Sequence, residues 1–173
     1  PRSTPLYSSA ASDVYKRQIQ AGLGSSEATD DWRTLAEFDL ASEPGNERLA
    51  MEQVAAAVAA ADSMPAARLE RLKTAVAEAT MNAMEHGNGY RADRPTHILV
   101  RRTPGAVSVR IFDHGAGPAV DAEAPDLEAK LAGLQTPRGW GLHLIKHMVD
   151  DLLITDEGGR HVVELVVRVD DPR

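Results

Sequence analysis

The central segment of this chain reads Glu78-Ala79-Thr80-Met81-Asn82-Ala83-Met84-Glu85-His86-Gly87, and it predicts a helix with one polar and one apolar face. Residues four apart on an α-helix differ by only about 40° in direction, so Glu78, Asn82 and His86 form one polar stripe. A carboxylate can polarise a hydroxyl group, and an amide oxygen one turn later can hold Mg²⁺ without adding charge. An ordinary solvated helix face would carry the same stripe. The helix is expected to span residues 66–86, and its apolar face comprises Leu69, Leu72, Val76, Ala79 and Ala83.

Around this helix the chain alternates between strand-like and helix-like segments. Strands are expected at residues 32–41, 96–102, 106–112, 152–155 and 161–169, where apolar residues alternate or run together between turn residues. Further helices are expected at 47–61, 126–134 and 141–149. This order predicts an α+β fold, a two-layer α/β sandwich with the helices on one face of a mixed, mainly antiparallel sheet.

The first 31 residues differ from the rest of the chain. They are rich in Ser, Ala and Gly without a sustained hydrophobic period, and residues 8–18 resemble an adapter-derived sequence artefact. We therefore expect 1–31 to be a disordered or artefactual tail and 32–173 to form one domain.

Composition and charge exclude several classes of function. The chain has 173 residues, a formal net charge of −7 and only 4% aromatic residues, which argues against nucleic acid as a partner. It has no cysteine, so disulfides and cysteine-based zinc sites are excluded. No apolar run approaches the ~20 residues that span a bilayer, and no signal peptide is evident, so we expect a cytoplasmic protein without a membrane partner.

A first glycine-containing motif, Ile111-Phe112-Asp113-His114-Gly115-Ala116-Gly117, directly follows a predicted strand. An Asp at a strand end can accept a hydrogen bond from an exocyclic amine, and glycines let the backbone approach a flat base closely. Taken alone, Asp with alternating glycines is also common in plain turns.

A second glycine-containing motif, Thr136-Pro137-Arg138-Gly139-Trp140-Gly141-Leu142, opens a predicted helix. Free N–H groups at a helix start can bind an anion, and Arg138 can add a charge-assisted contact. The motif is not a Walker loop, because no Gly-Lys-Ser or Gly-Lys-Thr occurs in the chain. A glycine-rich helix start with no ligand would have the same sequence.

Taken together, the order of these motifs resembles that of the GHKL (Bergerat-fold) ATPases. The polar helix stripe, the strand followed by Asp-x-Gly-x-Gly, and Arg-Gly-x-Gly-Leu at a helix start correspond to the N, G1 and G2 boxes of that superfamily. The resemblance covers roughly residues 35–169. Within the superfamily, residues 42–48, 85–88 and 139–146 look most like the RsbW and SpoIIAB class of anti-sigma-factor serine/threonine kinases.

The resemblance implies roles for the first two motifs. Glu78 would be the general base that activates a serine hydroxyl of a protein substrate, and Asn82 would ligate Mg²⁺. Asp113 would bind the adenine amino group, with Gly115 and Gly117 shaping the pocket.

The resemblance also assigns the third motif to ATP, with residues 118–137 as the lid over the nucleotide. His86 matches the family pattern as well, although a histidine at a helix end is equally expected as a structural cap. The ATP-binding residues of the third motif would be Arg138, Gly139, Trp140, Gly141 and Leu142.

One segment departs from the family pattern. Many GHKL proteins have a Gly-Thr pair before the final strand, and that threonine supports adenine binding. The corresponding stretch here reads Gly158-Gly159-Arg160-His161-Val162-Val163, without the threonine. Nucleotide binding could then proceed through Asp113 and water.

These implied roles predict an ATP-dependent serine/threonine protein kinase and anti-sigma factor. It would phosphorylate a STAS-type anti-anti-sigma partner, sequester a sigma factor and form a homodimer through the early strand and helix. Two alternatives are a non-catalytic nucleotide-binding regulatory module and the ATP-binding fragment of a two-component histidine kinase. The latter needs a phospho-accepting histidine on an upstream helix hairpin, and the residues before Trp32 are too few and too irregular to form one.

Overall fold

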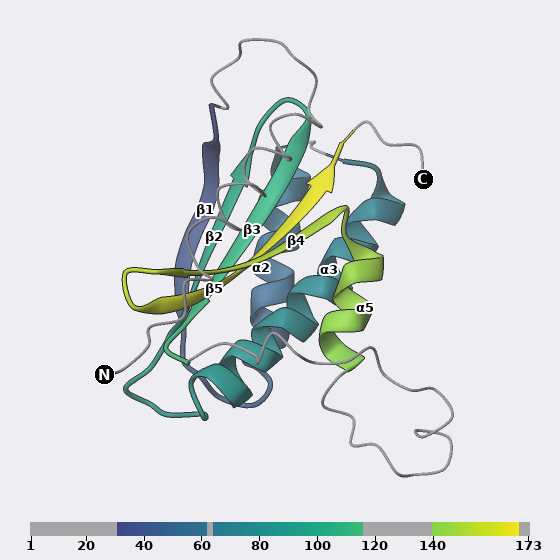
Figure 1. Cartoon of the computed structure of the whole chain (residues 1–173). Helices are drawn as coiled ribbons and strands as arrows, with labels where there is room; N and C mark the ends of the chain where they lie inside the picture. The colour runs from purple at the N-terminus through teal and green to yellow at the C-terminus, as the bar shows by residue number, and fades with distance from the viewer. Residues whose placement is uncertain (1–30, 62–63, 116–139, 170–173) are drawn as a thin grey trace, which may run out of the picture. The chain divides into compact units, whose positions relative to one another are not determined.

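The structure is a computed structural model that describes residues 31–61, 64–115 and 140–169 (Figure 1). Apart from Asp31, these residues belong to the unit Trp32–Arg173. None of the described helices is long and apolar enough to cross a membrane. The strands and helices, in chain order, are β1 (Arg33–Leu40), α2 (Asn46–Ala60), α3 (Ala66–Asn82), the π-helical turn η1 (Ala83–Gly87), β2 (Thr96–Arg102), β3 (Ala106–Asp113), α5 (Trp140–Met148), β4 (Asp151–Glu157) and β5 (Arg160–Arg168).

The described strands and helices match the predicted ones closely, except at two places. The helix expected at 66–86 ends as an α-helix at Asn82 and continues as the π-helical turn η1. The strand expected at 152–155 is longer and spans Asp151–Glu157. The helix predicted at 126–134 lies outside the described residues.

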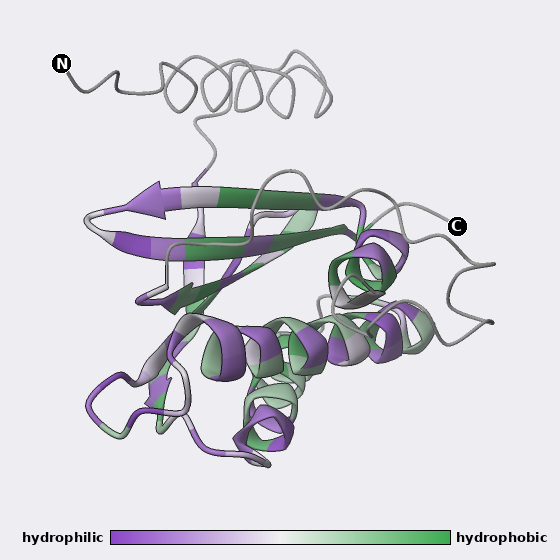
Figure 2. Cartoon of the chain, turned by 60° about the horizontal axis from the view of Figure 1, so that its bottom comes forward, coloured by the Kyte–Doolittle hydropathy of each residue, from purple (hydrophilic) through white to green (hydrophobic). Residues whose placement is uncertain are grey.

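The strands form one sheet in the order β1-β2-β3-β5-β4, and all four pairings between described strands are antiparallel. Helices α2, α3 and α5 lie together on one face of this sheet (Figure 2). The predicted two-layer α+β architecture is therefore confirmed.

An aliphatic core fills the space between the sheet and the helices. On α3, the predicted apolar face is confirmed, because Leu72 and Val76 are fully buried and Leu69 packs against the core from its edge. Alternate residues of the central strand β3 reach the same core, as expected for a period of two along a strand. They are Val107, Val109 and Ile111.

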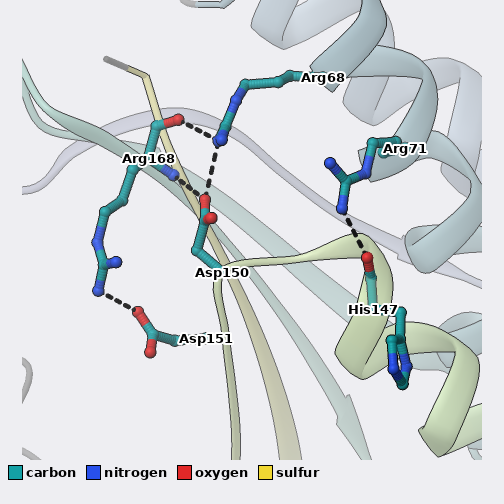
Figure 3. A network of polar contacts seen from close by, with 6 residues as sticks. All are labelled: Arg68, Arg71, His147, Asp150, Asp151 and Arg168. Carbon is teal, nitrogen blue, oxygen red and sulfur yellow. Dashed lines mark hydrogen bonds and ion pairs between the residues drawn. The ribbon is translucent and has the colours of Figure 1, made fainter. Parts of the chain in front are cut away.

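A buried ion pair joins α3 to the turn between α5 and β4 (Figure 3). Arg68 is only 7% exposed, and its Nη1 donates to Asp150 Oδ2 at 2.9 Å and to the carbonyl oxygen of Arg168 at 2.6 Å. Asp150 Oδ2 also accepts a hydrogen bond from the backbone N–H of Arg168 at 2.6 Å. One turn along α3, Arg71 donates to the carbonyl oxygen of His147 at 2.6 Å. These contacts fix the C-terminal end of α5 relative to α3 and β5.

We expect the Asp150→Ala substitution to lower the free energy of unfolding by about 3 kcal/mol, because it removes the carboxylate that accepts hydrogen bonds from the buried Arg68 guanidinium and from the backbone N–H of Arg168. Urea denaturation monitored by circular dichroism measures the change. The matched control is Asp93→Ala, which removes an exposed partner of Arg91 and should cost less than about 1 kcal/mol. Equal losses in the two variants would contradict the structural role of the buried pair.

Candidate functional site

The side chains of Glu78 and Asn82 meet the first turn of α5. A Cβ atom added to Gly141 would lie 2.5 Å from Glu78 Oε1 and 2.9 Å from Asn82 Nδ2. Real Cβ atoms essentially never come within 3.0 Å of another heavy atom in this way. Glycine at this position therefore lets α5 begin directly against α3, and it brings the first and third predicted motifs together.

Neither Glu78 nor Asn82 has a hydrogen-bond partner among the described residues, although both side chains are partly buried. The polar atoms of both side chains are not fully buried, so they remain accessible to water or to a ligand. The start of α5 adds backbone N–H groups that have no partner within the helix. Together these groups can hold an anion and its counter-cation side by side.

A cation at this place would take some of its ligands from beyond the described residues. Among the described residues, no group of three or more His, Asp or Glu side chains could hold a metal ion. The amide oxygen of Asn82 is a suitable ligand for Mg²⁺, which usually keeps several waters and takes further oxygens from phosphate groups. The residues present therefore fit a metal ion that arrives with a phosphorylated ligand.

The Asp113 carboxylate lies at the end of β3 and is 2% exposed. Its Oδ1 accepts a hydrogen bond from the backbone N–H of Gly115 at 2.7 Å. Its Oδ2 lies 2.9 Å from Nδ1 of His161, the second residue of β5. Both oxygens are thus held in place, and the carboxylate has one fixed orientation.

Two glycines pack closely against Asp113, namely Gly87 from η1 and Gly115 from the segment that follows β3. A Cβ atom on Gly87, the last residue of η1, would overlap the Asp113 carboxylate. A Cβ atom on Gly115 would lie 2.7 Å from the Cα of Gly87. The backbone after α3 therefore touches the carboxylate directly. Because α3 also contacts the start of α5, the three predicted motifs converge along α3 and η1.

The buried side chain of Asn88 forms hydrogen bonds to three segments of the chain beside this site. Its side chain is 1% exposed, and its Nδ2 donates to Ser42 Oγ at 3.0 Å and to Thr96 Oγ1 at 3.1 Å. Its Oδ1 accepts the backbone N–H of His114 at 2.9 Å. One side chain thus fixes the segment that follows Asp113 to the loop before α2 and to the start of β2.

The π-helical turn changes the position of His86. The N–H of Asn88 bonds to the carbonyl oxygen of Ala83 at 2.8 Å, so this turn holds one more residue than an α-helical turn. The extra residue breaks the four-residue spacing of the stripe, and the His86 side chain is 49% exposed, with Glu85 as its nearest ionic partner at 3.9 Å. The structure therefore brings together Glu78 and Asn82 but turns His86 toward solvent.

An acidic rim lies beside this turn. Desolvation, together with the charges of Glu85 and Glu47, raises the pKa of the Tyr90 hydroxyl, so this group stays neutral at physiological pH. Tyr90 also has a left-handed backbone conformation, with φ 50°, just after the Gly87–Gly89 turn.

Several predicted site residues cannot be compared with the structure. Gly117, Arg138 and Gly139 lie outside the described residues, and Trp140 is described only as the first residue of α5. Leu142 lies on α5 and packs partly against the hydrophobic core.

Sequence reasoning missed three residues of this site. Gly87 and Asn88 stand out in the sequence only as part of the stretch 85–88 that resembles the anti-sigma kinases, and their contacts with Asp113 and His114 depend on the fold bringing β3 beside η1. His161 stands out only as part of the stretch 158–163 that lacks the family's threonine, whereas its position opposite Asp113 follows from the register of β3 and β5.

We expect Asn88→Ala to lower the free energy of unfolding by about 1–3 kcal/mol, since Ser42, Thr96 and the N–H of His114 would lose a buried partner. Thermal and urea denaturation measure this loss. The control is Asn46→Ala, whose side chain makes an exposed bond to the carbonyl oxygen of Ala41 and should contribute less than about 1 kcal/mol. If the two variants are equally stable, Asn88 does not hold the site together.

Comparison with known proteins agrees with this arrangement. The model of the histidine kinase-like ATPase domain family matches residues 40–167, which include all three converging motifs. Among solved structures, a chain of the SiaB–SiaC complex from Pseudomonas aeruginosa shares the fold, with a TM-score of 0.54 and 15% identity over 91% of this chain and 98% of that one. No curated protein matches the chain in sequence. Because the family match spans most of its length and confirms the resemblance to the GHKL ATPases, the chain belongs to the histidine kinase-like ATPase domain family.

Proposed function

We propose that the domain formed by residues 32–173 is an ATP-dependent serine/threonine protein kinase and anti-sigma factor. It would phosphorylate a STAS-type anti-anti-sigma protein and sequester a sigma factor. The observation that carries the proposal is that Glu78 and Asn82 lie against the glycine-containing start of α5 and have no hydrogen-bond partner among the described residues. Polar side chains that make no hydrogen bonds within the described fold add little to its stability, but they can take part in phosphoryl transfer.

The geometry supports one orientation of the nucleotide. The adenine amino group would be bound by Asp113, beside Gly87 and Gly115, and the phosphates would lie at the start of α5 near Gly141. Gly87 lies nine positions after Glu78 along α3 and η1, which corresponds to roughly 13 Å along a helix. An extended nucleoside triphosphate spans such a distance. Gly117, Arg138 and Gly139 are proposed to complete the contacts to the base and the phosphates.

Asn82 is the proposed protein ligand of Mg²⁺, since its amide makes no hydrogen bond to the described residues. When bound, the metal ion supplies positive charge that offsets the charge developing on the transferred phosphoryl group.

Glu78 is the proposed general base. Its carboxylate would take the proton of the substrate hydroxyl as that oxygen bonds to the γ-phosphorus and the bond to the β-phosphate oxygen breaks, which releases ADP. Contact with Gly141 at the start of α5 keeps Glu78 beside the phosphate end of the site.

We expect Glu78→Gln to lower the rate of phosphate transfer to a cognate STAS protein by about 100-fold or more, because glutamine cannot accept the proton. Affinity for MgATP should change by less than about threefold. Transfer from radiolabelled ATP gives the rate, and calorimetric titration gives the affinity. The control is Glu70→Gln, an exposed glutamate on the same helix that pairs with Lys73.

This experiment also separates the kinase from a non-catalytic nucleotide-binding module. If the wild-type protein binds MgATP tightly but transfers no phosphate to any STAS partner, the non-catalytic alternative is favoured. If Glu78→Gln transfers phosphate as fast as the wild type, Glu78 is not the base.

We expect Gly87→Ala to abolish stabilisation by MgATP, because the added Cβ would displace the Asp113 carboxylate from the base-binding position. A ligand at 100 times its Kd stabilises the wild type by about 2.7 kcal/mol, whereas the variant should gain less than about 1 kcal/mol. Thermal denaturation with and without MgATP measures both increments.

The matched control is Gly105→Ala in the β2–β3 turn, where an added Cβ would have no atom within 4 Å. This variant should retain the full increment. A Gly87→Ala protein stabilised as strongly as the wild type would place the adenine elsewhere.

A protein partner and a homodimer are part of the same proposal. The fold is shared with a chain that was solved in a protein complex, which is consistent with a protein partner. Within the described sheet, β1 is an edge strand, and Leu49 on the neighbouring α2 is 45% exposed. An edge strand beside an exposed leucine is suited to pairing with a second copy of the chain.

A further inference from the structure

Two histidines lie one helical turn apart on the exposed side of α5. His143 and His147 are both exposed, and the centroids of their rings are 4.5 Å apart, with an angle of 54° between the ring planes. Residues at positions i and i+4 of a helix are neighbours on its surface. On the opposite side of α5, Ile145 and Val149 are buried in the hydrophobic core. The packing of α5 therefore holds the two histidines together at the surface.

One ring nitrogen of His147 already has a partner in the backbone. Its Nδ1 lies 2.8 Å from the carbonyl oxygen of His143. A carbonyl oxygen can only accept a hydrogen bond, so Nδ1 carries the proton, and in the neutral imidazole Nε2 keeps its lone pair. Histidines that bind metal ions usually donate the N–H of their other ring nitrogen to a carbonyl or carboxylate oxygen in this way. His147 thus has the tautomer that a metal ligand needs.

The distance between the two rings suits one shared metal ion. Bonds from zinc to an imidazole nitrogen are about 2.0–2.1 Å long, and two such bonds at an angle of about 90–110° place the ring centroids about 5 Å apart. The observed separation of 4.5 Å is close to this value. His143 has two ring nitrogens, so one of them can bind a metal ion while the other keeps a different partner.

The surroundings of the pair indicate which class of metal it would bind. Arg71, which donates to the carbonyl oxygen of His147 (Figure 3), and the exposed Lys146 place positive charge nearby and oppose any cation held by charge alone. Bonds to nitrogen lone pairs must therefore hold the ion. Imidazole suits zinc, copper and nickel, whereas magnesium and calcium prefer oxygen ligands.

We propose that His143 and His147 form a surface site for a divalent transition-metal ion, which joins two successive turns of α5. The described residues contain no group of three or more His, Asp or Glu side chains that could hold a metal ion, so water or groups from elsewhere would take the remaining positions. Helix α5 has nine residues, and short helices depend on contacts beyond their own backbone for stability. A metal ion at this site would stabilise α5, and its binding does not require a nucleotide.

Calorimetric titration of the full chain with ZnCl₂ and with MgCl₂ tests the proposal. We expect the wild type to bind Zn²⁺, and we expect His147→Gln and His143→Gln each to weaken this binding by about tenfold or more, because a glutamine amide is a poor ligand for zinc. The titration with MgCl₂ should be the same in all three proteins. The matched control is Lys146→Gln, an exposed change on the same helix that should alter the Zn²⁺ affinity by less than about threefold.

A second measurement uses the wild-type protein alone and does not depend on the folding of a variant. In ¹⁵N-labelled protein, the Nε2 resonance of His147 should shift when ZnCl₂ is added and should not shift with MgCl₂. An unchanged Nε2 resonance at saturating zinc would overturn the proposal. So would a Zn²⁺ affinity that survives in a folded His143→Gln/His147→Gln protein, or one that is lost in His86→Gln instead, since the metal ion would then lie elsewhere.

Discussion

Two close approaches between glycine backbone and polar side chains determine the geometry of this site. Gly141 places the first turn of α5 on Glu78 and Asn82, and Gly87 places the end of η1 on Asp113. Any side chain at either glycine would separate elements that the fold must hold in contact. Because α3 runs continuously into η1, both contacts are made by one rigid segment, and the distance between them is set by the helix itself.

The polar groups along this segment are arranged in opposite ways at its two ends. Asp113 and Asn88 are buried and have fixed hydrogen bonds, so their orientation is set by the fold itself. Glu78 and Asn82 are only partly buried and have no partner among the described residues. A preorganised end suits recognition of a base, and an end with unpaired groups suits charged phosphates and a metal ion that bring their own partners.

Much of this arrangement could be predicted from the sequence. The parts that could not be predicted share one physical cause. The amphipathic pattern of α3, the hairpin of β2 and β3 and the order of the motifs depend on residues close together in the chain. The π-helical turn is closed by the bond from the N–H of Asn88 to the carbonyl oxygen of Ala83, and the four-residue spacing that places His86 on the stripe does not predict it. The role of His161 depends on the register of β3 with β5, which pairs residues 48 positions apart.

The position of α5 is determined at both of its ends by contacts with α3. Its C-terminal end is fixed by the buried pair of Arg68 with Asp150 and by the bond from Arg71 to the carbonyl oxygen of His147. Toward its N-terminal end, Gly141 packs against Glu78 and Asn82, and Leu142 and Ile145 pack against the hydrophobic core. The contacts that carry charge are thus at the C-terminal end of the helix, whereas the contacts at its start leave polar side chains of α3 without a hydrogen-bond partner among the described residues. The same pair of helices therefore combines a structural ion pair at one end with an open polar site at the other.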